Sequence, residues 1–111
     1  FESLHDAMDA MEAADVEGNH ELWLMLDRDF HNYLANNSDN ERLSMLYRHA
    51  HEMVFHDTWQ VPSPTIGGKI SCAEHRMIVE AIENANPMRA QQLAMNHMLR
   101  TRARIEKQMQ G

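Results

Sequence analysis

The residues best suited to chemistry lie in the segment 27–31, Asp-Arg-Asp-Phe-His. On a helix, residues four apart project about 40° from each other, so Asp27 and His31 would present a carboxylate and an imidazole side by side. Such a pair can bind a divalent metal ion. It can equally be an aspartate that accepts a hydrogen bond from a buried imidazole, because carboxylate and histidine side chains often pair at this spacing on helices.

Two more histidines have the same character. On helical wheels, His75 and His97 fall inside the apolar arcs of two other predicted helices, as Asp27 and His31 do in theirs. Each alone could be an ordinary core residue that its neighbours satisfy. A buried carboxylate, however, is costly unless it is paired or binds a metal. The four residues Asp27, His31, His75 and His97 are therefore predicted to meet in the core as metal ligands.

Three imidazoles and one carboxylate suit a first-row divalent ion, with Zn²⁺ as the first choice and Ni²⁺ or Mn²⁺ as alternatives. Four protein ligands in a tetrahedron would close a structural zinc site. An ion with five or six ligands would instead keep positions open for water or for the oxygens of a small carboxylate.

Three residues are candidates for contacting such a bound ligand. Arg104 could clamp a carboxylate with two hydrogen bonds, or it could form a salt bridge near a helix end. Ser71, one turn before His75, could donate its hydroxyl, although serine followed three residues later by Glu74 also matches a capping box. Trp59 could cover the pocket or simply pack the loop around it.

The elements that must position these residues are all helices. Apolar residues recur at helical spacing, and no stretch alternates as a strand would. Gly18 is predicted to end the first helix, and Asn19 and Asn86 to cap later ones. The predicted helices cover residues 1–15, 19–36, a stretch after Asn40, a stretch beginning at Ser71, and residues 87–109. The fold class is therefore all-α, an antiparallel bundle of about five to six helices.

A long loop and the overall composition complete the prediction. The segment 59–69 holds two prolines and two glycines, so it is either a functional lid or a plain surface connection. The chain has 111 residues, the length of one domain, and a formal net charge of −7, which opposes direct binding to nucleic acid or to an acidic membrane. It starts at Phe1 without an initiator methionine, which suggests a fragment.

Compartment and membrane contact follow from simple features. The single cysteine, Cys72, cannot form an internal disulfide, and no signal-peptide pattern opens the chain, so the cytoplasm is the predicted location. No apolar run approaches the roughly 18 to 20 residues that a membrane-spanning helix needs.

Sensing, catalysis and plain packing are the three functions to compare. An open metal ion with an exchangeable water could serve a small metalloenzyme. Metalloenzymes normally add a general acid or base beside the metal, and the wheels show no surplus carboxylate on a buried face. We therefore predict a sensor and not an enzyme. A helical interaction module without metal would need Asp27 and the three histidines to satisfy one another.

The combined pattern resembles the FCD domain, the all-helical effector-binding domain of the FadR subfamily of GntR transcription regulators. The resemblance covers nearly the whole chain, and no single part of it is specific. The residues that carry it are Asp27, Phe30 and His31, then Asn40, then Glu74, His75, Arg76, Ala81 and Ile82, and finally Ala90, Met95, His97 and Met98.

The resemblance implies a function. Many members bind a divalent metal through one aspartate and three histidines, which here are Asp27, His31, His75 and His97. The metal and nearby side chains hold a small organic acid or sugar acid. An N-terminal winged helix-turn-helix domain binds operator DNA as a homodimer, and the effector changes its placement.

Two departures from the family are visible. The winged helix-turn-helix domain is missing, and so is the first helix of the effector domain, which can contribute a basic residue to the pocket. Residues 1–111 are thus expected to be the remaining effector-binding part. Met98 stands where the family usually has leucine, a change that leaves the predicted metal ligands untouched.

Overall fold

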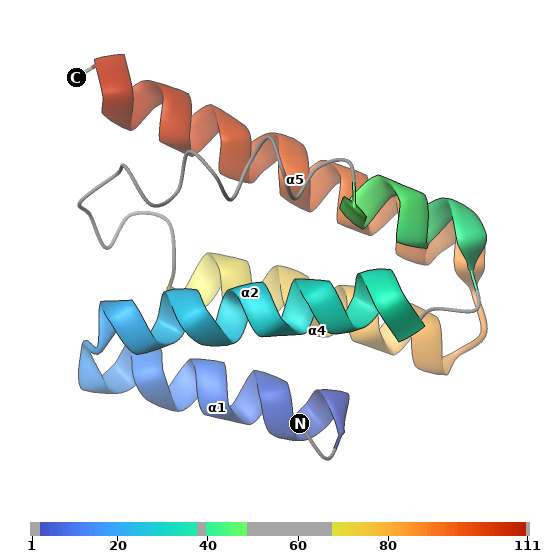
Figure 1. Cartoon of the computed structure of the whole chain (residues 1–111), viewed down its shortest axis with the longest axis horizontal. Coiled ribbons are helices and arrows are strands. Elements are labelled where there is room, and N and C mark those ends of the chain that lie inside the picture. Colours follow the sequence, from blue (N-terminus) through green and yellow to red (C-terminus); the bar gives the residue numbers. More distant parts are fainter. Residues whose placement is uncertain (1–2, 38–39, 49–67, 111) are drawn as a thin grey trace.

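The computed structural model describes residues 3–37, 40–48 and 68–110 (Figure 1). All regular structure in these ranges is helical, which confirms the all-α class. The helices are α1 (Leu4–Glu17), α2 (His20–Asn37), a helical segment at 41–48, α4 (Lys69–Glu83) and α5 (Pro87–Gln110). Within these ranges no helix is both long and apolar enough to cross a membrane.

The turn after α1 has the geometry that its sequence predicts. Gly18 has φ +73°, in the left-handed region that favours glycine. The N–H of Asn19 donates to the carbonyl of Ala14 at 2.9 Å, which satisfies a carbonyl at the helix end. At the other end of α1, Ser3 Oγ accepts a hydrogen bond from the N–H of Asp6. Both ends of this helix are therefore capped by local contacts.

Asparagine side chains cap three of the remaining helices. Asn19, Asn40 and Asn86 each precede a helix, and each Oδ1 accepts a backbone N–H three residues later at 3.2 Å. The predicted caps at Asn19 and Asn86 are confirmed. Asn40 has a second role, because its Nδ2 donates to the carbonyl of Pro87 at 3.1 Å and so ties the segment 41–48 to the start of α5.

The predicted capping box at Ser71 is wrong. The helix α4 begins at Lys69, and Gly68 occupies the cap position without a side-chain hydrogen bond. Ser71 lies inside the helix and is only 1% exposed. Glu74 does not reach back to a backbone N–H, because its carboxylate points into the bundle and contacts His97. The sequence matches a capping box, but the two side chains contact residues of another helix instead: Ser71 contacts Arg104, and Glu74 contacts His97.

The bundle consists of two hairpins. Close backbone contacts link α1 with α2, α4 with α5, and α1 with α4. In the described residues, no Cα atom of α2 comes within 8 Å of one in α4 or α5. In Figure 1, α2 lies between α1 and α5, with α4 behind it. The space that separates α2 from the α4–α5 hairpin is therefore bridged by side chains, among them the fully buried Phe30 and Trp23.

Candidate metal centre

The four residues predicted as metal ligands meet in the interior. Asp27 and His31 come from α2, His75 from α4 and His97 from α5. All four are buried, and none is more than 4% exposed. The ring centroids of the three histidines lie 4.7 to 5.4 Å from one another. Each histidine offers a nitrogen within 4.8 Å of those of the other two.

Specific atoms of these side chains converge. Asp27 Oδ1 lies 3.1 Å from His31 Nε2 and 3.1 Å from His75 Nε2. His75 Nε2 in turn lies 3.2 Å from His97 Nε2. Although it is this close to two imidazoles, Asp27 Oδ1 accepts no hydrogen bond of ordinary geometry from the residues described. The four side chains thus bring these atoms to a common region, and of these contacts only that between His75 and His97 has the geometry of a hydrogen bond.

These spacings fit a metal ion. Two ligand atoms that share one ion at about 2.0–2.1 Å are about 2.8–3.4 Å apart, the lower values at octahedral angles and the upper at tetrahedral angles. The distances of 3.1, 3.1 and 3.2 Å lie in that range. Three imidazole nitrogens and one carboxylate oxygen are also a donor set that Zn²⁺, Ni²⁺ and Mn²⁺ accept. The residues present therefore fit a divalent ion of this class.

Burial sets the protonation of the cluster. Burial lowers the pKa of His75 and of His97 below the usual value, although their carboxylate partners oppose the shift. For Asp27, burial acts to raise the pKa, but the contacts with His31 and His75 outweigh it and the pKa is lowered. Neutral imidazoles and an ionised carboxylate are the forms that bind metal.

Aromatic rings enclose the cluster. Trp23 stacks on His75 with ring centroids 6.2 Å apart, and Phe30 packs against the same imidazole at 4.8 Å. Tyr47, from the helical segment 41–48, packs against His31 at 5.1 Å. These rings keep water from the histidines and limit how the imidazoles can rotate.

Glu74 is a charged core residue that sequence analysis missed. It is 8% exposed, and its Oε1 lies 2.9 Å from His97 Nδ1. Arg100 Nε donates to its Oε2. Burial acts to raise the pKa of this carboxyl, but the hydrogen bonds and charges of His97 and Arg100 outweigh that effect and lower it. The expectation of no surplus carboxylate on a buried face is therefore wrong.

A signal for Glu74 existed in its spacing. It lies three residues after the buried Ser71 and four before the buried Ile78, so it shares their side of α4. The capping-box interpretation gave Glu74 a role at the helix start, so the buried side of α4 on which Glu74 lies was not considered.

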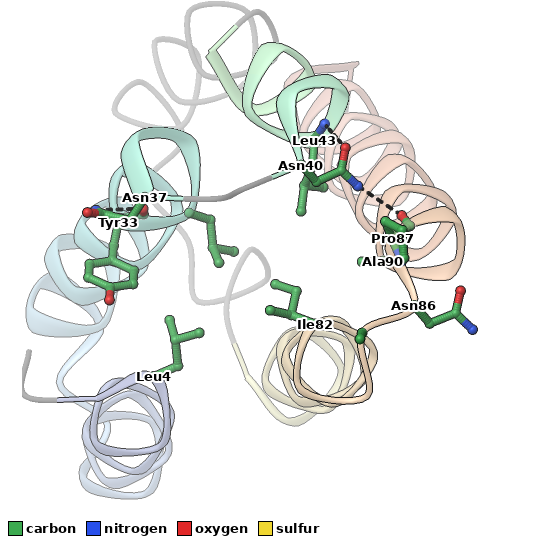
Figure 2. Close-up of a pocket in the computed structure, with 11 residues that line it drawn as sticks. Leu4, Tyr33, Asn37, Asn40, Leu43, Ile82, Asn86, Pro87 and Ala90 are labelled. Carbon is green, nitrogen blue, oxygen red and sulfur yellow. Dashed lines mark hydrogen bonds between the residues drawn. The ribbon is translucent and has the colours of Figure 1, made fainter.

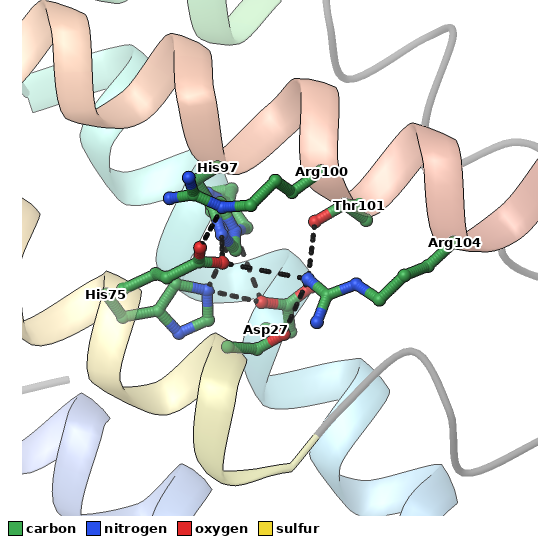
Figure 3. Close-up of polar contacts among 9 residues, drawn as sticks. Asp27, His75, His97, Arg100, Thr101 and Arg104 are labelled. Carbon is green, nitrogen blue, oxygen red and sulfur yellow. Dashed lines mark hydrogen bonds and ion pairs between the residues drawn. The ribbon is translucent and has the colours of Figure 1, made fainter.

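Arg104 borders the cluster, and the contacts that the structure gives it are with other side chains of the chain. Figure 3 shows its side chain reaching back from α5 toward Asp27 and Thr101. Its Nη2 lies 3.4 Å from Ser71 Oγ, 3.5 Å from Thr101 Oγ1 and 3.6 Å from Glu74 Oε1. Ser71 is thus placed beside Arg104. Trp59 and most of the predicted loop at 59–69 lie outside the described residues.

A separate cavity opens at one end of the bundle. Its volume is about 580 Å³, and it shares no lining residue with the histidine cluster. Figure 2 shows it between the start of α1, the end of α2 and the turn that joins α4 to α5. The lining side chains are uncharged: Leu4, Tyr33, Leu34, Asn37, Asn40, Leu43, Ile82, Ala85, Asn86, Pro87 and Ala90.

Comparison with known proteins agrees with the helical fold and with the motif residues. The family model of the FCD domain matches residues 1–100. No curated protein and no solved structure matches the chain. The match spans most of the 111 residues and includes Asp27 and all three clustered histidines. The chain belongs to the FCD domain family, the effector-binding domains of GntR-type transcription regulators.

Proposed function

We propose that this chain is a metal-dependent sensor of a small organic acid or sugar acid. Asp27, His31, His75 and His97 hold the divalent ion, with Zn²⁺ as the first choice. The ion, when bound, supplies a Lewis-acidic point of attachment for a carboxylate. The observation that carries the proposal is the convergence of these four buried side chains from three helices, with spacings of 3.1 to 3.2 Å between donor atoms.

Arg104 is the residue best placed to select an acid. Its Nε is buried and has no hydrogen-bond partner in the described part of the chain, and its Nη2 contacts are long at 3.4 to 3.6 Å. The guanidinium therefore has donors to spare for a carboxylate. Its side chain is 26% exposed, so it also connects the buried cluster with solvent. Ser71, which contacts Arg104, is a second candidate donor to the ligand, and Trp59 a third contact.

Membership in the FCD family also supports a regulatory role for this chain. We propose that effector binding here controls operator DNA through a winged helix-turn-helix domain of the same regulator, which acts in the cytoplasm as a homodimer of the FadR subfamily. The net charge of −7 agrees with DNA contact by another domain and not by this one.

Glu74 bears on the alternative of a small metalloenzyme, because it is a buried carboxylate one residue from His75. A general base near neutral pH needs a pKa close to that pH. The pKa of Glu74 is lowered, and its oxygens contact His97, Arg100 and Arg104. A carboxylate held in this way is a poor proton acceptor, which favours the sensor.

The proposal can be tested by measuring metal content and acid binding in one set of variants. The purified chain should bind about one equivalent of Zn²⁺, because the four side chains converge on one region, and that ion should keep a coordination position open for the acid. His75→Ala should lose both Zn²⁺ and the binding of succinate or galactonate, measured by calorimetry, while circular dichroism shows an intact helical fold. Arg104→Gln should keep Zn²⁺ and weaken acid binding by roughly ten- to a hundredfold, the value of a hydrogen bond to a charged group.

Two controls give the result its meaning. His5→Ala removes a histidine on the exposed side of α1 and should change neither binding reaction. Arg102→Gln removes an exposed arginine on α5 and should leave acid binding unchanged. Full acid affinity in the metal-free wild-type chain would refute the metal-dependent sensor.

A further inference from the structure

Glu74 occupies a defined place in the cluster. Its carboxylate lies on the outer side of His97, at 2.9 Å from Nδ1, while His97 Nε2 faces His75 at 3.2 Å. The two nitrogens of one imidazole are thus directed to different partners. Only one of them faces the convergence of Asp27, His31 and His75.

The chemistry of the contact fixes the proton on His97. An ionised carboxylate can only accept hydrogen bonds, so His97 Nδ1 must be the donor. Arg100 and Arg104 lie against the same carboxylate, at Oε2 and Oε1, and supply positive charge that keeps it ionised. A neutral imidazole with its proton on Nδ1 has a free lone pair on Nε2, the nitrogen that faces the cluster.

His75 offers an internal contrast. Its Nδ1 is buried and has no hydrogen-bond partner among the described residues. Its ring is held by packing against Trp23 and Phe30 and not by an outer acceptor. Of these two imidazoles, only His97 has a carboxylate at its outer nitrogen, Nδ1, whereas the carboxylate near His75 is Asp27, on the side of the cluster.

We propose that Glu74 is a positioning residue of the metal centre, which holds His97 in the Nδ1–H tautomer and directs its Nε2 lone pair at the ion. The proposal rests on the metal centre proposed above. Glu74 itself does not touch the ion; it acts through the imidazole, and Arg100 and Arg104 hold it in place. Carboxylates behind metal-bound histidines commonly play this part.

Metal affinity in a series of variants tests the proposal. Co²⁺ binding to the full chain is measured by its absorption, and Zn²⁺ binding by competition with a chromogenic chelator. Glu74→Ala should weaken both by about ten- to a hundredfold, as loss of such a partner does elsewhere. Glu80→Ala makes the same substitution at an exposed position of the same helix and should leave both affinities unchanged.

Glu74→Gln separates positioning from charge. The glutamine amide oxygen can still accept from His97 Nδ1, but the negative charge is gone. Positioning predicts that Glu74→Gln retains more affinity than Glu74→Ala. Equal losses in the two variants would mean that Glu74 acts through its charge and would overturn the proposal.

The tautomer of His97 can be measured directly, and it would not change if Glu74 only stabilised the fold. Nitrogen-15 spectra of the metal-free chain should show the proton of His97 on Nδ1, and Glu74→Ala should remove that preference. A wild-type His97 with its proton on Nε2 would overturn the proposal.

His97→Ala and the wild-type chain show whether the positioning role of Glu74 or the metal centre itself is refuted. If His97→Ala loses the metal but Glu74→Ala binds it with wild-type affinity, the positioning role alone is refuted. If the wild-type chain binds neither Co²⁺ nor Zn²⁺, the metal centre itself fails.

Discussion

At the scale of single residues, the core of this chain is unusual for the number of ionisable groups that it holds. Asp27, Glu74 and the clustered histidines are all at most 8% exposed. Their contacts with one another and with two arginines offset the cost of burial. Partners of this kind are needed because an unpaired buried charge costs several kcal/mol.

The pH dependence of stability follows from the buried histidines. In the folded chain, burial lowers the pKa of His75 and His97. In the unfolded chain, the pKa of each of these imidazoles is about 6.5. As the pH falls below that value, the unfolded chain takes up protons that the folded chain refuses, so the free energy of unfolding falls.

Urea unfolding of the metal-free chain between about pH 7.5 and about pH 5.5 would measure this effect, with a slope of at most about 1.4 kcal/mol per pH unit for each histidine. His97→Ala should reduce the slope. The lowered pKa values of Asp27 and Glu74 add a further loss only in more acid solution, where these carboxylates take up protons. A stability that rises on acidification over this range would contradict the assignment.

At the scale of elements, three of the described helices begin at an asparagine cap. Asn19, Asn40 and Asn86 cap with the same geometry, each accepting a backbone N–H at 3.2 Å. Only Asn40 combines its cap with a contact to another helix, through Nδ2 and the carbonyl of Pro87. Its loss should therefore affect packing as well as local helix formation.

Asn40→Ala and Asn86→Ala form a matched pair for testing this difference. Loss of a cap costs about 1 kcal/mol, and loss of a further hydrogen bond about another 1 kcal/mol. Asn40→Ala should thus lower the free energy of unfolding by about 2 kcal/mol and Asn86→Ala by about 1 kcal/mol. Chemical denaturation of both variants would decide, and equal losses would show that the contact with Pro87 adds nothing.

Local signals predicted most of the elements but not all of their side-chain roles. Gly18, Asn19 and Asn86 lie at helix ends because of backbone chemistry that is legible in a short stretch of sequence. Helical wheels also placed Asp27 and the three histidines on inward faces, where the structure has them. Ser71 and Glu74 were misjudged because their partners, Arg104 and His97, come from another helix.

At the scale of the whole molecule, the cluster of Asp27 and the three histidines lies where the two hairpins face each other. The α1–α2 hairpin provides Asp27 and His31, and the α4–α5 hairpin provides His75 and His97. Backbone contact between the hairpins runs through α1 and α4. Which side chains from distant segments meet depends on this arrangement, which no local pattern encodes.

A bound ion should stabilise the whole bundle. An ion that binds only the folded chain adds about 2.7 kcal/mol when present at a hundred times its dissociation constant. Thermal unfolding followed by circular dichroism should therefore show a rise in Tm when Zn²⁺ is added to the wild-type chain. His75→Ala should show no such rise, and an equal rise in that variant would place the stabilising ion elsewhere.

The distance between α2 and the α4–α5 hairpin has a mechanical consequence. Because side chains alone cross that interval in the described residues, the size of whatever is bound among them affects how far α2 lies from the α4–α5 hairpin. An acid that pulled on Arg104 and on the ion together would draw α5 toward α2, and that displacement would be carried along the length of each helix to its ends. If the proposed acid binds in this way, its signal would be a change in the spacing between α2 and α5.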